Sequence, residues 1–171
     1  MTICRLISVI VIFSFATLTT SIASATQPGW YFGGGLGNSD PDKGGFDDDT
    51  GLRLFGGYNT DGRLAFEGAF VDLGEFDRGA LEFEVDGFQF AALYHLPIGD
   101  TFSIFGTAGL YFWDADGSGG ARNDDGTDVT FGFGAQYDNE RWGIRVGWER
   151  FDDVEPDDVD MLSVSGVLHI K

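Results

Sequence analysis

The C-terminal segment, residues 141–171, alternates between apolar and polar side chains, and this alternation limits the possible folds more than any other feature. Within it, Trp142 and Trp148 lie on one face. The opposite face holds Arg145, Glu149 and two glycines. A period of two is typical of a β-strand, whose successive side chains point to opposite sides. The chain therefore ends in strands, and its last strand needs a partner.

The composition of the two faces favours a membrane barrel over a soluble one. A membrane barrel turns its large apolar side chains outward to lipid and keeps charge and glycine inside. Residues 128–137 repeat this pattern, with Phe131 and Phe133 on the apolar face. Glycines occupy the face opposite to them. In a closed barrel the first strand pairs with the last, so that no edge stays exposed.

Eight strands are predicted from the alternation. The last two lie on either side of residues 152–158, and the first six cover about residues 30–37, 52–58, 63–73, 83–96, 101–113 and 128–137. In the fifth strand both faces carry apolar side chains, so its outward face stays open. We predict an all-β fold, an eight-stranded up-and-down antiparallel transmembrane β-barrel, because these lengths suit the roughly 9–11 residues of a tilted spanning strand.

The connections between the strands alternate between short and long. The short turns are residues 59–62, 97–100 and 138–140. The long connections are residues 38–50, 74–82, 114–127 and 152–158. Most of the 28 acidic residues fall in or beside the long connections. This predicts four long acidic loops at one end of the barrel and both termini at the other, as in bacterial outer-membrane barrels.

Residues 1–25 have the features of a cleaved secretory signal peptide. Arg5 is the only charge, residues 6–18 are mostly apolar, and Ala23-Ser24-Ala25 fits a small-x-small cleavage site. The apolar run is too short to span a membrane. We expect a signal peptide at 1–25 and one barrel domain at 26–171, which is exported across the inner membrane to the outer membrane of a Gram-negative bacterium.

The composition argues against several functions. Cys4 lies in the predicted leader, so the mature domain has no cysteine for a disulfide, a thiolate metal site or a nucleophile. A net charge of −18 makes the chain a poor binder of nucleic acid. His95 and His169 fall at strand ends, and neither has a serine two residues on. We therefore expect no enzymatic activity and no cofactor.

Aromatic side chains are expected at both lipid–water interfaces, where such belts mark the membrane boundaries. The predicted interface residues are Trp30, Tyr58, Tyr94, Tyr137 and Trp142 at the turn end of the barrel, and Trp148 at the loop end.

Glycine-rich and aromatic motifs follow one another along residues 28–171: GWYFGGGLG, LFGGY, LAFEGAFVDLG, ALYHLP, IRVGWERFDD and DVDMLSVSGVL. In this order and spacing the chain resembles the OmpA-like and OmpX-like eight-stranded outer-membrane barrels. The resemblance implies recognition of the C-terminal strand by the barrel-assembly machinery, although Ile170 stands where the family usually has an aromatic residue. It does not include the peptidoglycan-binding domain of full-length OmpA.

Four charged residues are predicted to point into the lumen. Glu67 and Arg145 match positions where OmpA-like barrels hold buried charge. Arg53 and Glu149 also point inward in the predicted register. Side chains nearly fill an eight-stranded barrel, and buried charges must be paired to be tolerated. We expect a structural lumen charge network of these four residues, with ion conduction as the alternative.

One acidic segment imitates a calcium-binding loop. Asp114, Asp116 and Ser118 have the spacing of the first ligands, and Asp125 takes the twelfth position. No helices are predicted beside it, and Arg122 occupies a ligand position. A solvated acidic loop is therefore favoured over a metal site. Divalent cations gathered by the whole acidic end would bridge to lipopolysaccharide phosphates.

These observations predict a monomeric integral outer-membrane barrel with a structural or surface-interaction role. Its predicted partners are outer-membrane lipid and lipopolysaccharide. A narrow, porin-like channel for small ions or solutes is the second hypothesis. A soluble periplasmic ligand-binding barrel is the third, and it requires the opposite orientation of the faces, with Phe131 inside.

Overall fold

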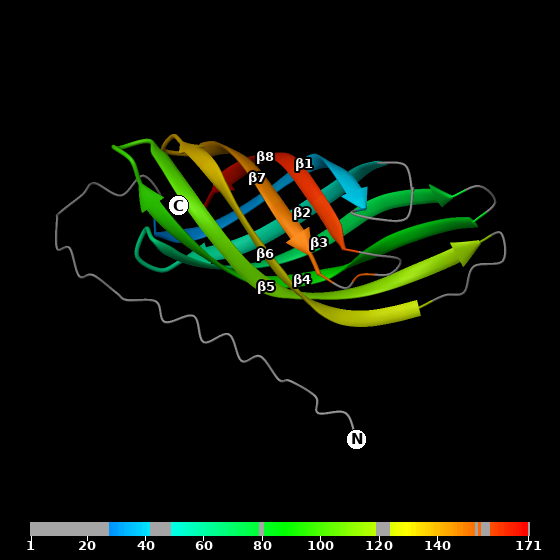
Figure 1. Cartoon of the computed structure of the whole chain (residues 1–171). Coiled ribbons are helices and arrows are strands. Elements are labelled where there is room, and N and C mark those ends of the chain that lie inside the picture. The colour runs from blue at the N-terminus through cyan, green and yellow to red at the C-terminus, as the bar shows by residue number, and fades with distance from the viewer. Residues whose placement is uncertain are drawn as a thin grey trace, which may run out of the picture.

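The computed structural model describes residues 28–41, 49–78, 81–118, 124–152, 154 and 158–170. These residues form eight strands: β1 (Gly29–Pro41), β2 (Asp49–Asn59), β3 (Leu64–Arg78), β4 (Leu81–Pro97), β5 (Phe102–Ser118), β6 (Asp124–Asp138), β7 (Trp142–Phe151) and β8 (Val159–His169). Each strand pairs antiparallel with its neighbours in the sequence, and β1 pairs with β8 to close the barrel (Figure 1). The predicted all-β, up-and-down barrel is confirmed.

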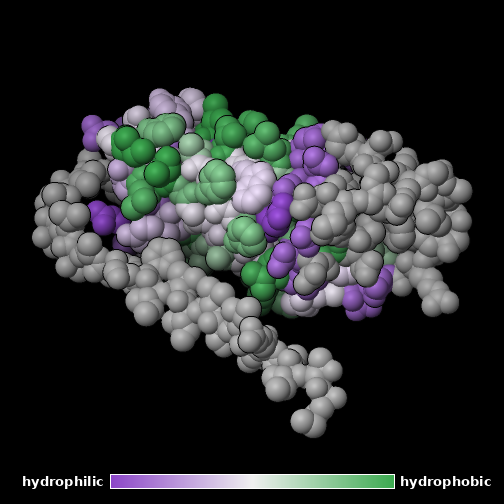
Figure 2. Space-filling view, in the orientation of Figure 1, coloured by the Kyte–Doolittle hydropathy of each residue, from purple (hydrophilic) through white to green (hydrophobic). Residues whose placement is uncertain are grey.

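The apolar faces point outward, as the alternation predicts. Phe131 and Phe133 are exposed on β6, whereas Thr130 between them is buried. Figure 2 shows hydrophobic side chains gathered over the body of the barrel. The hypothesis of a soluble ligand-binding barrel is therefore wrong, because such a barrel would bury these phenylalanines. Among the described residues no helix is long and apolar enough to cross a membrane.

Strand β5, whose faces the sequence leaves open, has a clear orientation in the structure. Leu110 and Phe112 are exposed on the outer face, whereas Tyr111 and Trp113 are buried inside. Both faces are apolar because the large inward side chains of this strand are aromatic: Tyr111 packs against Phe151, Phe105 lies beside the Arg145 guanidinium, and Trp113 donates a hydrogen bond to Asp128. The period of two is therefore intact, but residue polarity alone could not identify the outer face.

The short turns form where they were predicted. In the β2–β3 turn, Asn59 Oδ1 accepts a hydrogen bond of 2.6 Å from the backbone N–H of Gly62. Asp61 Oδ1 accepts bonds from the N–H groups of Arg63 and Leu64, both 2.9 Å. Gly62 has a φ of 81°, a conformation that glycine adopts without a steric cost.

Two of the four predicted long loops are instead largely strand. β3 runs to Arg78 and β4 begins at Leu81, so most of residues 74–82 is a hairpin. β5 runs to Ser118 and β6 begins at Asp124. Acidic and apolar residues alternate in sequences such as Glu82–Asp86, and this alternation is a strand signal that the density of charge obscured.

The extension of β5 and β6 also changes the interpretation of the calcium-like segment. Asp114, Asp116 and Ser118 lie in β5, and Asp125 lies opposite Asp114 on β6. An extended strand does not bend around one ion as a calcium loop does. No group of three potential metal ligands occurs within the described part of the chain. The predicted leader, residues 1–25, lies outside the described residues.

Candidate functional site in the barrel lumen

Three strands from opposite sides of the barrel bring the four predicted lumen charges together. Arg53 on β2 lies 2.9 Å from Glu67 on β3, and 2.7 Å from Glu149 on β7. Arg145, also on β7, lies 2.7 Å from the second oxygen of Glu67. The side chain of Glu67 is fully buried. Each carboxylate therefore has a guanidinium partner, which offsets the cost of burying its charge.

Polar residues continue this ion-pair network toward the turn end of the barrel. Arg145 Nε donates to Gln136 Oε1 at 2.7 Å. Gln136 Nε2 in turn donates to both oxygens of Asp138, and Asp138 lies 2.8 Å from His169 Nε2. Tyr31 donates its hydroxyl to Glu67 at 3.0 Å. The network thus reaches from the middle of the lumen to the last strand.

Toward the loop end, the network finishes on two uncharged side chains. Gln89 Nε2 donates to Glu149 and, at 2.7 Å, to Thr130 Oγ1. Gln89 is buried on β4 and Thr130 on β6. Strands β1 to β4 and β6 to β8 therefore all contribute to one chain of polar contacts across the lumen.

Aromatic rings enclose the cationic part of the network. The guanidinium carbon of Arg145 lies 4.7 Å from the centre of the Phe55 ring, 5.4 Å from Phe105 and 5.7 Å from Tyr31. Rings at these distances attract a cation through their electron-rich faces. Strand β5 contributes Phe105, which replaces water around Arg145 and so supports a dry, fixed position for this side chain.

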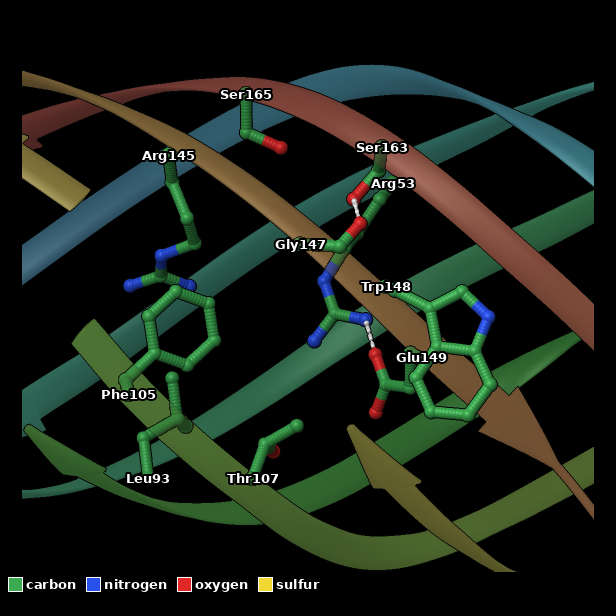
Figure 3. A pocket seen from close by; sticks show the side chains of 10 residues that line it. All are labelled: Arg53, Leu93, Phe105, Thr107, Arg145, Gly147, Trp148, Glu149, Ser163 and Ser165. Atoms are coloured by element: carbon green, nitrogen blue, oxygen red, sulfur yellow. Dashed lines mark hydrogen bonds and ion pairs between the residues drawn. The ribbon is translucent and has the colours of Figure 1, made fainter. Parts of the chain in front are cut away.

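A small cavity of about 30 Å³ lies beside the network, between Arg53, Arg145 and Glu149 (Figure 3). Thr107 also lines it, and its Oγ1 is buried without a hydrogen-bond partner among the described residues. The cavity has the size and the polar groups to hold about one water molecule. It is far too small for a continuous water-filled path.

On the loop side of the ion-pair network the lumen is apolar. Tyr111 and Phe151 pack edge to face with ring centres 4.9 Å apart, and both are fully buried. The Tyr111 hydroxyl donates to the carbonyl of Val71 at 2.9 Å. We call this group the apolar plug; its other members are Leu73, Val85, Val154, Val159 and Met161. The described side chains therefore fill the barrel on the loop side of the charges.

A match to a known protein family identifies the class of this protein. Residues 7–167 match the family described as outer membrane protein beta-barrel domain. The chain belongs to this family. It is an integral outer-membrane β-barrel of the Gram-negative type, and this family consists of small barrels that are generally not enzymes. The predicted location is confirmed.

Solved structures of bacterial barrels share the fold of this family member. Ail, the attachment invasion locus protein of Yersinia pestis, is 16% identical with a TM-score of 0.61, over 84% of this chain and 100% of Ail. Neisserial surface protein A is 14% identical with a TM-score of 0.67, over 82% and 97%. The N-terminal barrel domain of Pseudomonas aeruginosa OprF is 13% identical with a TM-score of 0.63, over 84% and 100%. No curated protein sequence matches the chain.

The predicted interface aromatics of this outer-membrane barrel lie near its two ends. At the turn end, Trp30 and Tyr58 are exposed and their rings pack 5.1 Å apart. Tyr137 and Trp142 form a second exposed pair at 5.9 Å. The remaining two predicted residues are Tyr94, which is exposed at the turn end of β4, and Trp148, which packs against Phe131 and Phe133 on the outer face of β7.

Several residues of the lumen network were not predicted. The sequence predicts Asp138 in a short turn and His169 at a strand end, yet these two side chains pair inside the barrel. Gln89 and Gln136 were assigned only to inward faces. Their inward positions were the available signal, because an inward glutamine next to a predicted ion pair is a plausible hydrogen-bond partner.

Proposed function

We propose that this outer-membrane barrel is a non-conducting scaffold that presents an acidic β-sheet outside the cell. The observation that carries the proposal is the filled lumen, in which an ion-pair network and the apolar plug lie one above the other. An ion in transit would have to separate the buried ion pairs and then cross apolar side chains, and both steps are costly. The proposal includes no enzymatic activity.

The presented surface is the part of the sheet that extends beyond the closed barrel. Strands β3 to β6 continue past the ends of β7 and β8 and form the long hairpins at the right of Figure 1. The turn end holds the short connections and the ends of β1 and β8, as on the periplasmic side of such barrels. This supports an orientation in which the extended hairpins face the outside.

One edge of this extended sheet lacks a neighbouring strand within the described residues. β6 pairs with β7 only from Thr130 onward, so among the described residues the strand segment Asp124–Asp128 pairs with β5 alone. The Val129 carbonyl points to the β7 side, where it accepts from the N–H of Asp152 at 3.1 Å. Because a residue's N–H and C=O point the same way in a strand, those of Asp125 and Thr127 face the same open side.

An open strand edge is a template for an added strand, and its side chains select the partner. Asp124 and Asp125 are exposed on this edge, and Asp128 lies two positions before the barrel proper. The chemistry that fits is an extended segment of a partner protein that carries Lys or Arg. Two proteins of the same fold, the attachment invasion locus protein Ail and Neisserial surface protein A, have names that are consistent with such a role.

Binding of a lysine-rich extended peptide to the protein in nanodiscs tests the surface role. Thr127→Pro removes an N–H from the open edge, where proline is tolerated. It should lower the affinity for the peptide about tenfold, and the matched Thr127→Ala should not, because ~1.4 kcal/mol of hydrogen bonding corresponds to a factor of ten. Equal affinities for both variants, or equal binding of a glutamate-rich peptide, would refute strand addition at this edge.

Conductance in planar bilayers separates the scaffold from the porin-like channel. The cavity beside the ion pairs is only about 30 Å³, which is too small for a path through the lumen. Conduction would therefore require the ion pairs to rearrange. We expect no current steps from wild-type protein whose insertion is verified by heat-modifiable gel mobility. Steps that disappear in Arg145→Ala would establish the channel instead.

A further inference from the structure

An apolar groove of about 530 Å³ crosses the outer face of the barrel where β1 meets β8. Its walls are the outward side chains of β1, β2, β7 and β8, namely Phe32, Leu54, Trp142, Ile144 and Leu168. Its lining is almost entirely apolar. The groove lies in the half of the barrel nearest the turn end, because Trp142 begins β7 and Leu168 precedes the last residue of β8.

Two paired glycines form the floor of this groove. Gly34 on β1 lies directly opposite Gly166 on β8, and Ile144 flanks Gly166 on the other side. An added methyl group at Gly166 would meet no protein atom within 4 Å. Glycine inside a strand destabilises it relative to alanine, because glycine loses more backbone freedom on folding. At Gly34 an added methyl group would lie 2.8 Å from the Leu54 side chain, whereas at Gly166 the packing of the protein does not require glycine, so the effect of Gly166 is to keep the groove open.

A cationic residue, Arg141, directly precedes the strand end that borders the groove. Arg141 immediately precedes Trp142, and its carbonyl accepts a hydrogen bond of 3.0 Å from the N–H of His169, next to Leu168. Arg141 is exposed, as is its neighbour Glu140. Trp142 is also exposed at this level, where aromatic rings mark the membrane interface. An arginine at this depth suits the phosphate of a lipid headgroup.

We propose that the groove binds one anionic phospholipid, with an acyl chain over Gly34 and Gly166 and the phosphate at Arg141. The face is in contact with the membrane, so a hydrocarbon chain is the apolar molecule available to fill it. Dispersion contacts with the five walls and the glycine floor would hold this chain longer than the lipids around smooth parts of the barrel. The lipid is a phosphatidylglycerol-like molecule of the periplasmic leaflet in the orientation proposed above.

Native mass spectrometry of protein released from phosphatidylglycerol nanodiscs tests the site. Wild-type protein should retain one phospholipid on a monomer, and Gly166→Leu, which fills the groove, should lose it. The matched control is Gly106→Leu, because Gly106 is also exposed to lipid and has room for a side chain, but lies on β5 away from the groove. It should retain the lipid. Equal lipid retention by wild type and Gly166→Leu overturns the proposal.

The headgroup contact needs a separate measurement. Arg141→Gln should reduce the preference for phosphatidylglycerol over phosphatidylcholine at least threefold while one lipid is still retained from either membrane. An unchanged preference would remove Arg141 and the anionic headgroup from the site. A dimer in wild type that becomes monomeric in Gly166→Leu would show a second copy of the chain in the groove, and would also overturn the proposal. Symmetric nanodiscs make these outcomes independent of the orientation assigned to the barrel.

Discussion

A carboxylate oxygen of Glu67 lies 2.7 Å from Nη1 of Arg145, although 78 positions separate the two residues in the sequence. The other oxygen of Glu67 binds Arg53. This single buried carboxylate therefore contacts two guanidinium groups that come from different sides of the barrel, and Glu149 supplies the second negative charge. The position of Glu67 makes it the residue on which the arrangement of the lumen depends most.

Replacement of Glu67 by alanine should strongly destabilise the barrel. The change leaves Arg53 and Arg145 buried with one fewer carboxylate partner, and loss of one partner of a buried ion pair costs about 3–5 kcal/mol. Urea unfolding in detergent micelles, followed by tryptophan fluorescence, would measure the loss. Arg63→Ala at the β2–β3 turn is the control, with an expected change below about 0.5 kcal/mol. Equal stabilities for the two variants would contradict the structural role of the network.

A positive charge on the lipid face of β6 should impair membrane insertion. Phe131 is 44% exposed on this face, beside the Trp148 ring at 6.2 Å. Phe131→Lys is expected to cost about 2–4 kcal/mol near the bilayer midplane and less close to the interface. The heat-modifiable band of folded protein should decrease in the outer-membrane fraction, and Phe131→Leu should leave it unchanged. Normal insertion of the lysine variant would show that this face does not meet lipid.

Four aspartates lie side by side across the outer end of the sheet. The strand register places Asp72 opposite Asp86, Asp86 opposite Asp114, and Asp114 opposite Asp125. Like charges directly opposite one another destabilise a sheet by up to about 1 kcal/mol per pair.

Neutralisation of this row should therefore stabilise the protein. Asp114→Asn removes the charge between Asp86 and Asp125, so its free energy of unfolding should exceed that of the wild type by a few tenths of a kcal/mol or more at low salt. The difference should shrink toward 0.5 M NaCl, because salt screens exposed charges. Denaturant titrations at two salt concentrations measure both effects, and a less stable Asp114→Asn at low salt would contradict net repulsion.

The β2–β3 turn should respond to acid. The backbone N–H groups of Leu64 and Arg63 donate to the Asp61 carboxylate and hold its pKa below the usual value. A lowered pKa in the folded state means that the carboxylate stabilises the fold above its unfolded pKa, and that this contribution is lost as the pH falls through the folded pKa. Asp61→Ala should therefore be less stable than wild type at pH 7 and equal to it at pH 2. A difference that is independent of pH would exclude titration of Asp61 as the cause.

Sequence patterns predicted the barrel and the four charged residues of its lumen, because both follow from the alternation of inward and outward side chains along each strand. Once β2, β3 and β7 are strands with apolar outer faces, Arg53, Glu67 and Arg145 must point inward, and ion pairing follows from burial. The outer end was predicted less well. Charge density in residues 74–82 and 114–127 suggested loops, whereas backbone pairing within two hairpins extends the strands there.

The contact between Asp138 and His169 was beyond sequence reasoning for a geometric reason. The two residues lie on β6 and β8, with β7 between them, and alternation says nothing about contacts across an intervening strand. Gly143 is the residue of β7 that faces this contact, and a side chain there would collide with Asp138. Gly143 is the sequence signal for this contact, because a glycine leaves room for two inward polar side chains to meet. The signal is recognisable only when the strand register is known.

The ion pairs of the lumen also bear on how long the folded barrel persists. Two of them join residues 78 and 96 positions apart, from β3 to β7 and from β2 to β7, so these two form only after the sheet has curled and brought its two halves together. Contacts that are absent from the transition state of folding affect the unfolding rate and leave the folding rate almost unchanged. We therefore expect the charged centre of this barrel to slow unfolding, and so to lengthen the lifetime of the protein in the membrane, with little effect on the speed of its assembly.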